Sequence, residues 1–390
     1  MEYSIYPQVV LKKGREGADS RNHPWIFSGA IHLIDERIKA GDIVRVESSK
    51  NEFIGIGTFS SGSISVRILS RVDTIIDKNF FVYKIKKAKG LRDILNINSN
   101  AYRLVHGEGD NLSGLIIDRY NNVFVIQAHD EGIYYKIDLI KDALVEIFGK
   151  DIIVYNKSNK TIPFLKDVED NFIYGESIAE TEIIENGNKF IIDFVKGQKT
   201  GFFIDQRDNR ERLKSFAKDK KVLNTFAYTG GFSVYALSAG AKECTSVDAS
   251  DNALSILNQN IAKNNFSQNH KSVNSDIFKF FEKNEEKFEL IVVDPPAFAK
   301  HQKAKKQALN GYTRLNLMAI NSLKENGVIF TFSCSQAISE DEFQRAIFNA
   351  VLQSNRECKI LDKLSQPADH PRNIFHQEGK YLKGFILKFD

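Results

Sequence analysis

One stretch in the second half of the chain constrains the fold more than any other. It starts with a short apolar run at residues 222–227, continues as Tyr228-Thr229-Gly230-Gly231-Phe232-Ser233, and passes through a helical run to a second apolar run that ends at Asp248. This order predicts a strand, a tight turn, a helix and a second strand. Open α/β sheets are built from such units, and they bind ligands beyond the carboxyl ends of their strands.

The turn and the acid indicate a nucleoside-containing ligand. Glycines let the backbone approach a ligand closely, and a carboxylate at Asp248 can accept both ribose hydroxyl protons. The turn lacks the full G-x-G-x-x-G spacing with which a helix N-terminus holds a pyrophosphate. We therefore favour S-adenosylmethionine over NAD as the cofactor. An ordinary strand-to-helix turn without a ligand is the alternative interpretation.

The rest of this half alternates strands with helices. Further strands are expected at residues 271–274, 288–293 and 328–333, and helices at 252–264, 312–323 and 340–352. This alternation predicts a doubly wound, Rossmann-like parallel sheet. The last two strands, at 360–364 and 385–389, have no helix of crossover length between them and are expected to pair antiparallel.

The N-terminal residues predict a small all-β module. Short strands are expected at residues 9–12, 42–47, 53–59 and 63–69. A basic cluster precedes the aromatic segment His23-Pro24-Trp25-Ile26-Phe27, and its members are Lys12, Lys13, Arg15 and Arg21. Cations pair with phosphates and rings stack on bases, so this combination suits RNA. A solvated loop followed by buried aromatic side chains explains the same residues.

Residues 72–178 predict an α+β region. They comprise a basic amphipathic stretch at 80–91, a hairpin turned at 120–122, a helix at 134–148 and two short strands. The lysines of the basic stretch are either an RNA contact or a solvated helix face. We expect three domains, at residues 1–71, 72–178 and 179–390.

Composition narrows the class of protein. The net charge of +4 does not by itself establish nucleic-acid binding. Three cysteines, Cys244, Cys334 and Cys358, are too few and too scattered for a disulfide framework or a zinc site, so no metal is expected. The sequence shows neither a signal peptide nor an apolar run of membrane-spanning length, so a cytoplasmic protein without membrane contact is expected.

Two further segments follow neighbouring strands of the expected sheet. They are Asp294-Pro295-Pro296-Ala297-Phe298 and Ser333-Cys334-Ser335. Adjacent parallel strands end at one edge, so the acid and the thiol are expected to converge there. A thiol can add to C6 of a pyrimidine and make C5 nucleophilic, while Asp294 hydrogen-bonds the N3 edge of the ring. The alternative is that Cys334 is a small buried packing residue.

These segments resemble a known family. Residues 224–233, Asp294-Pro295-Pro296-Ala297-Phe298 and residues 331–335 are similar to motifs of class I S-adenosylmethionine-dependent RNA cytosine-5 methyltransferases, and within them to the bacterial 23S rRNA large-subunit methyltransferase I family. The resemblance extends over nearly the whole chain. It implies an N-terminal PUA-type RNA-binding domain, a middle α+β domain and a C-terminal methyltransferase domain.

The resemblance also implies roles for individual residues. Cys334 matches the nucleophile, Asp294 lies between the methionine part of the cofactor and the target base, Asp248 takes the ribose hydroxyls, and Asp276 lies by the adenine amino group. The full set expected to bind the cofactor is Gln198, Thr200, Phe202, Asp205, Arg207, Thr229, Gly230, Gly231, Phe232, Asp248, Ala249, Ser250, Asp276 and Asp294. Many related enzymes have a second cysteine after the Asp-Pro pair, where this chain has Pro296-Ala297, so the base for the C5 proton is unassigned.

The leading hypothesis is methylation of a cytosine in 23S rRNA that is unstructured or immature, because the base must be unstacked to react. An RNA nitrogen methyltransferase, which needs no thiol, and a non-catalytic RNA-binding ribosome-assembly protein stay open as alternatives. The oligomeric state also stays open, with a homodimer among the options. Basic residues after the Asp-Pro-Pro turn are either an RNA-facing loop or plain solvated charge, and they are Lys300, His301, Lys303, Lys305 and Lys306.

Overall fold

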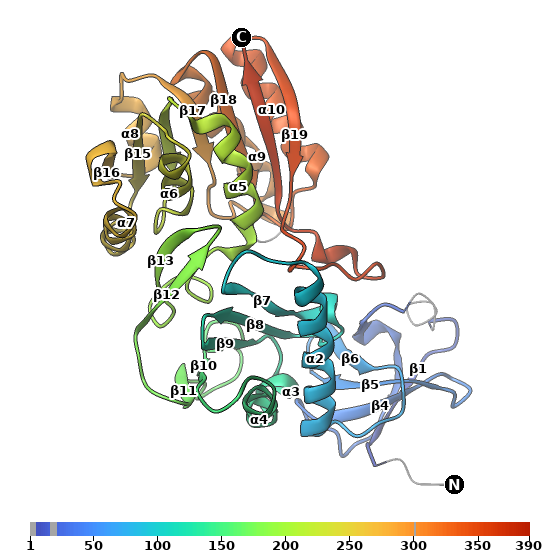
Figure 1. The fold of residues 1–390 in the computed structure, drawn as a ribbon. Coiled ribbons are helices and arrows are strands. Elements are labelled where there is room, and N and C mark those ends of the chain that lie inside the picture. The colour runs from blue at the N-terminus through green and yellow to red at the C-terminus, as the bar shows by residue number, and fades with distance from the viewer. Residues whose placement is uncertain (1–4, 16–21, 300–301) are drawn as a thin grey trace. The chain divides into compact units, whose positions relative to one another are not determined.

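The computed structural model describes residues 5–15, 22–299 and 302–390 (Figure 1). Three residues of the predicted basic clusters, Arg21, Lys300 and His301, lie outside these ranges. The chain forms two compact units. The first comprises Met1–Thr181, Ile192–Gly201 and Ala368–Gly379, and the second comprises Glu182–Ile191, Phe202–Pro367 and Lys380–Asp390.

The first unit begins with a six-stranded sheet of order β2-β6-β5-β4-β1-β3. Its strands are β1 Gln8–Leu11, β2 Trp25–Phe27, β3 Ile31–Ile34, β4 Ile43–Glu47, β5 Phe53–Phe59 and β6 Ile64–Ser70. The four strands that the sequence predicts are confirmed, and their alternating apolar side chains form the core around Val44, Val46 and Val66. The prediction missed β2 and β3, which are too short to show a clear alternation.

A five-stranded sheet of order β11-β10-β9-β8-β7 follows in the same unit. Its strands are β7 Ala101–His106, β8 Leu115–Tyr120, β9 Val123–Ala128, β10 Ile153–Asn156 and β11 Asn171–Tyr174. Helix α2 (Lys78–Ile94) packs against helix α4 (Ile137–Phe148) and against β7. The hairpin β8–β9 is confirmed, with Asn121 at a positive φ of 59° in its turn.

The single helix predicted at residues 134–148 is wrong in its first part. The chain forms a short helix α3 (Glu131–Tyr134) before α4 instead. Asp130 caps α3, because its carboxylate accepts a hydrogen bond from Ile133 N at 2.9 Å. The capping acid therefore starts the helical segment earlier than the apolar pattern indicated.

A segment near the C-terminus, Ala368–Gly379, belongs to the first unit. Asp369 accepts a hydrogen bond from Arg103 N at 3.0 Å through its carboxylate, and its carbonyl oxygen accepts one from Arg92 at 2.7 Å. A Cβ at Gly109 would clash with the carbonyl oxygen of Pro371, so a glycine is required for this close approach. This long-range pairing has no counterpart in local sequence patterns.

Strands β12 (Glu180–Glu185) and β13 (Asn188–Asp193) form a two-stranded hairpin. Its turn uses Asn186 at φ 49° and Gly187 at φ 82°. Both positive angles suit Asn and Gly, the residues that stand at these two positions.

The second unit contains a seven-stranded sheet of order β16-β15-β14-β17-β18-β20-β19. Its strands are β14 Lys221–Thr225, β15 Glu243–Asp248, β16 His270–Asn274, β17 Phe288–Val293, β18 Leu323–Ser333, β19 Cys358–Leu364 and β20 Lys383–Phe389. The first five in this order are parallel, and β20 runs antiparallel to both of its neighbours. The predicted doubly wound sheet and the antiparallel pairing of the last two strands are confirmed.

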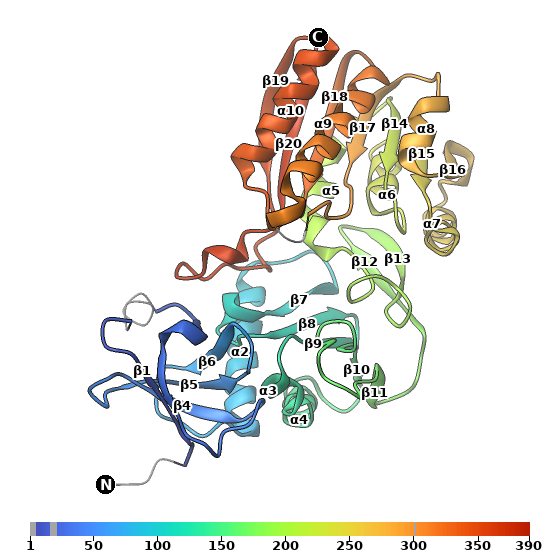
Figure 2. The ribbon, with the colours of Figure 1, turned by 180° about the vertical axis from the view of Figure 1, so that it is seen from behind.

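Helices cover both faces of this sheet (Figures 1 and 2). Those on one face are α5 Arg207–Ala217, α6 Gly231–Ser238 and α7 Asp251–Lys263, and those on the other are α8 Ile277–Lys283, α9 Lys305–Asn321 and α10 Glu340–Ser354. The core between α8–α10 and the strands includes Leu223, Ile291 and Phe385, which are fully buried. In the part of the chain that the structure describes, no helix has the length and apolarity needed to span a membrane.

Candidate active site

The turn after β14 has an unusual backbone. Phe226 and Tyr228 have positive φ angles of 54° and 47°, and Gly230 has a φ of 84°. Aromatic residues seldom adopt this conformation, and strain of this kind is concentrated at functional sites. A Cβ at Gly230 would lie 2.8 Å from Leu257 Cγ, so packing against α7 also requires a glycine here. Helix α6 begins directly afterwards, at Gly231.

Asp248 ends strand β15 next to this turn. Its carboxylate accepts hydrogen bonds from the backbone N–H groups of Tyr228 and Ser250, each at 2.9 Å. Ser250 caps helix α7, and the side chain of Ala249 is exposed. Two backbone donors fix the orientation of the carboxylate, and its oxygens retain lone pairs that can accept further hydrogen bonds.

The side chains of the turn point to different environments. Thr229 Oγ1 is buried, and no described residue forms a hydrogen bond with it. The carbonyl oxygen of Thr229 accepts a hydrogen bond from Asn260 at 2.9 Å. Phe232 packs on Phe332 of β18 with ring centroids 5.7 Å apart. A ligand hydroxyl or amine beside Thr229 would satisfy the orphaned oxygen.

Asp276 follows strand β16, the neighbour of β15. It caps helix α8 by accepting a hydrogen bond from Lys279 N at 3.1 Å, and its side chain is exposed. The third carboxylate at this edge of the sheet, Asp294, follows β17 and accepts a hydrogen bond from Gln206 at 3.0 Å. Gln206 is in turn held by Asn209 at 2.6 Å. Gln206 is not among the predicted site residues, although it lies between two of them, Asp205 and Arg207.

Cys334 lies directly after β18. Its sulfur is 3.9 Å from the carbonyl oxygen of Pro295, in the turn that follows β17. Strands β17 and β18 are parallel neighbours, with Val293 opposite Thr331. The structure therefore brings together the thiol and the Asp-Pro-Pro turn, as the strand order led us to expect. The side chain is half-buried rather than sealed in the core.

Tyr312 fixes the serines on both sides of the thiol. Its hydroxyl accepts a hydrogen bond from Ser333 at 2.9 Å and lies 3.0 Å from Ser335 Oγ. Ser335 also accepts a hydrogen bond from Ala299 N at 3.3 Å. Burial is the main cause of the raised pKa of Tyr312, so its hydroxyl stays protonated. Tyr312 was missed because it lies within a helix, far from either motif in the sequence.

Lys383 places a cation at the same loop. Its Nζ donates hydrogen bonds to the carbonyl oxygens of Ser335 at 2.7 Å and Ile338 at 2.9 Å. Burial lowers the pKa of Lys383 to about 8, and the charge of Cys334 as a thiolate acts in the opposite direction. The ammonium thus stabilises the loop and favours negative charge on the sulfur. Lys383 lies 48 positions from Ser335 in the sequence, and its role was not predicted.

Residues 202–207, which end at the first residue of α5, are held in place by contacts within the second unit. Phe202 packs between the Phe190 ring, 5.1 Å away, and the Arg210 guanidinium, 4.6 Å away. Asp205 accepts a hydrogen bond from the Tyr381 hydroxyl at 2.7 Å. Arg207 is buried and forms an ion pair with Asp208 at 3.2 Å. These contacts stabilise the fold, and they leave the predicted cofactor role of the three residues as a prediction.

Two of the predicted cofactor residues, Gln198 and Thr200, belong to the first unit. Thr200 is fully buried and donates a hydrogen bond to Asp118 at 2.6 Å, and its hydroxyl lies 2.8 Å from that of Tyr120. Gln198 is exposed, and its carbonyl oxygen accepts a hydrogen bond from Gly201 N at 2.8 Å. Their role toward a cofactor also stays a prediction.

Comparisons with known proteins agree with this geometry. A model of S-adenosylmethionine-dependent methyltransferases matches residues 149–372, and a model of PUA-like domains matches residues 9–71, which confirms the predicted N-terminal module. Ribosomal RNA large subunit methyltransferase I of Aliivibrio fischeri is 38% identical over 100% of both chains, and that of Klebsiella pneumoniae is 36% identical over 100% of both chains. A solved methyltransferase structure complexed with SAH is 24% identical, covers 98% of this chain and 100% of that chain, and has a TM-score of 0.85. This structural similarity is evidence for the fold alone.

Proposed function

Because the chain belongs to the ribosomal RNA large subunit methyltransferase I family of S-adenosylmethionine-dependent methyltransferases, we propose that it methylates C5 of a cytosine in 23S rRNA. The observation that carries the proposal is the half-buried thiol of Cys334, 3.9 Å from the carbonyl oxygen of Pro295 in the Asp-Pro-Pro turn. A nitrogen methyltransferase has no use for a thiol at this position.

The described residues fit the cofactor. In this proposal the Asp248 carboxylate, which two backbone N–H groups hold, accepts the ribose hydroxyl protons. Thr229, with its orphaned hydroxyl, and Gly231 would hold the methionine part, and Asp276 the adenine amino group. When bound, S-adenosylmethionine supplies a methyl group activated by a positively charged sulfur.

The protein activates the base in this proposal. The Cys334 thiolate adds to C6 of the cytosine, forming a carbon–sulfur bond and making C5 nucleophilic toward the methyl group. Asp294, anchored by Gln206, acts here in its protonated form: its carboxyl O–H donates a hydrogen bond to N3 and stabilises the negative charge that thiolate addition creates in the ring. Once C5 carries the methyl group, a base that stays unassigned in this chain takes up the C5 proton. The electron pair of the C5–H bond re-forms the C5–C6 double bond, and the carbon–sulfur bond breaks to restore the aromatic base and the thiolate.

Substitution of the nucleophile tests the chemistry. Protein-free 23S rRNA is incubated with methyl-labelled cofactor and the full chain, and the modified nucleoside is identified by mass spectrometry. We expect 5-methylcytidine with the wild type and a loss of roughly 10³-fold or more in rate with Cys334→Ala. Cys358→Ala, which changes a half-buried cysteine on β19, is the matched control and should retain the wild-type rate.

The same experiment separates the alternatives. A methylated guanine or adenine nitrogen, together with full activity of Cys334→Ala, would show a nitrogen methyltransferase. No methyl transfer to 23S rRNA in any form would favour a non-catalytic RNA-binding protein. RNA containing 5-fluorocytosine adds a direct readout, because fluorine cannot leave C5 as a proton does. The wild type should form a covalent complex with this RNA, and Cys334→Ala should form none.

A further inference from the structure

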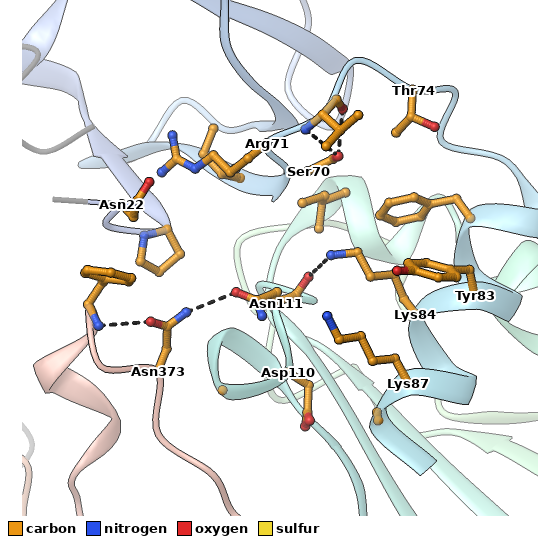
Figure 3. Close-up of a pocket in the computed structure, with 18 of the residues that line it drawn as sticks. Asn22, Ser70, Arg71, Thr74, Tyr83, Lys84, Lys87, Asp110, Asn111 and Asn373 are labelled. Carbon is orange, nitrogen blue, oxygen red and sulfur yellow. Dashed lines mark hydrogen bonds between the residues drawn. The ribbon is translucent and has the colours of Figure 1, made fainter. Parts of the chain in front are cut away.

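A cavity of about 880 Å³ lies within the first unit, and none of the candidate active-site residues lines it. Its lining includes the end of β6 with Arg71, one side of helix α2, the turn with Asp110 and Asn111, and the segment Ala368–Gly379 with Asn373 and Phe375 (Figure 3). Its volume is within the range of about 300–1,000 Å³ that is typical of ligand sites. The cavity therefore has room for a small ligand or for a short part of a large one.

The charge in the cavity is positive. Lys84 and Lys87 project into it from the same face of α2, toward Asn111 (Figure 3). Lys84 donates a hydrogen bond to the carbonyl oxygen of Asn111 at 3.1 Å. Among the described residues, neither lysine has a carboxylate within ion-pair distance. Burial, together with a smaller contribution from repulsion by Lys87, lowers the pKa of Lys84 to about 8. An anion between the two ammonium groups would therefore be stabilised.

The acid in the lining does not compensate this charge. Asp110 forms a bidentate ion pair with Arg92, with one N–O distance of 2.8 Å, and its carboxylate also accepts a hydrogen bond from His106 N at 2.6 Å. In Figure 3 its carboxylate points away from Lys84 and Lys87. The negative charge of Asp110 is thus used within the fold, and the charge of the lysines is available to a ligand.

Aromatic and amide side chains accompany the lysines. Tyr83 is 65% exposed and Phe375 is 45% exposed, although both carry large rings. Asn373 donates a hydrogen bond to Asn111 Oδ1 at 3.0 Å, and its own oxygen accepts one from Phe375 N at 2.9 Å. Exposed rings stack on nucleobases, amides hydrogen-bond to base edges, and ammonium groups bind phosphates. An acidic peptide would use the cations but not the exposed rings.

We propose that this cavity binds one or two unpaired nucleotides of the RNA substrate other than the methylated one. The phosphates lie at Lys84 and Lys87, and a base stacks on Tyr83 or Phe375. The inference rests on the proposed function in so far as the ligand is RNA. It adds a second site that selects single-stranded or bulged RNA, because a paired base cannot enter a cavity of this kind.

The test uses the double variant Lys84→Gln/Lys87→Gln in the full chain. Its matched control is Lys86→Gln/Lys89→Gln, which removes the same charge from the same helix outside the cavity. We expect the cavity variant to bind a single-stranded 23S rRNA fragment about tenfold or more weakly, with the slope of log K against log salt reduced by about 1.4 for two lost phosphate contacts. Tyr83→Ala should weaken binding about tenfold without changing this slope, because stacking involves no counterion.

Methyl transfer provides the second readout. With saturating RNA the cavity variant should keep the wild-type kcat, whereas KM for RNA should rise about tenfold. Unchanged RNA affinity and salt slope would overturn the proposal, as would equal losses in the control variant. Loss of binding to an acidic peptide with unchanged RNA affinity would assign the cavity to a protein partner instead. If the wild type failed to methylate any rRNA but only the cavity variants lost RNA binding, the proposed reaction would be wrong and the RNA site would stand.

Discussion

Lys383 Nζ donates a 2.7 Å hydrogen bond to the carbonyl oxygen of Ser335, the residue that follows the candidate nucleophile Cys334. Only 3% of the Lys383 surface is exposed, so this cation is fixed and largely shielded from water. Burial lowers its pKa to about 8. Near neutral pH the ammonium form is present and favours the thiolate, and above pH 8 this support is lost.

We expect Lys383→Met to slow methyl transfer by roughly tenfold at pH 7, about the effect of removing one charge interaction. The wild-type rate should rise with pH as the thiol ionises and then fall above about pH 8 as Lys383 loses its proton. The variant should lack the alkaline decrease. Single-turnover rates between pH 6 and 10 measure both profiles, and Lys388→Met on the same strand is the control. Identical profiles for wild type and Lys383→Met would exclude this role.

Asp248→Asn tests the cofactor site. The carboxylate now accepts from two backbone N–H groups, and an asparagine has only one oxygen to offer them. The variant also loses the charged acceptor for the ribose hydroxyls. We expect its affinity for S-adenosylhomocysteine, measured by titration calorimetry, to fall roughly 10- to 100-fold, in line with about 1.5–3 kcal/mol for hydrogen bonds to a charged group. Asp251→Asn, at an exposed position at the start of helix α7, should bind like the wild type.

The core of the methyltransferase sheet could be predicted because its strands are buried on both faces. Such strands appear as short apolar runs between polar turns, and the prediction for β17 coincides with the observed Phe288–Val293. Strand β7 was missed because Arg103 and His106 interrupt its apolar pattern. Arg103 is tolerated there because Asp118, on the next strand, pairs with it at 2.8 Å. A local pattern does not contain that partner.

The residues of the candidate site also fall into those that could be predicted from the sequence and those that could not. Asp294 and Cys334 could be located because each directly follows a predictable strand. Gln206 and Lys383 could not, because they reach the site through hydrogen bonds to residues 88 and 48 positions away in the sequence. Polar contacts across such separations depend on the packed structure, which gives no periodic signal.

Gly230→Ala should destabilise the second unit by about 2–3 kcal/mol. The variant must adopt a φ of 84° with a side chain, and its Cβ would lie 2.8 Å from Leu257 Cγ. Gly240→Ala is a matched control, because Gly240 has nearly the same φ of 85° but its nearest neighbour, Lys218 Cγ, is 3.8 Å from the added atom. The control should cost only about 1 kcal/mol, the conformational part. Urea unfolding of both variants measures the difference, and equal losses would show that the contact with Leu257 relaxes freely.

His270 should make the protein sensitive to acid. Its Nε2 lies 2.8 Å from Ser246 Oγ, and burial lowers its pKa to about 4 from the ordinary value of 6.5. The unfolded chain therefore binds this proton at a higher pH than the folded chain, so stability falls as the pH decreases from 6.5 to 4 and is unaffected by this group above 6.5. For a half-buried side chain we expect about 2 kcal/mol, less than the full shift would give.

The comparison variant is His270→Gln, whose amide can still bond to Ser246 but does not titrate. The free energies of unfolding of the two proteins are measured by urea denaturation at pH 7 and pH 4.5. Acidification should lower the stability of the wild type by about 2 kcal/mol more than that of His270→Gln. His32→Gln, at an exposed position on β3, should follow the wild type at both pH values. A constant difference between wild type and His270→Gln would mean that His270 titrates normally in the folded chain.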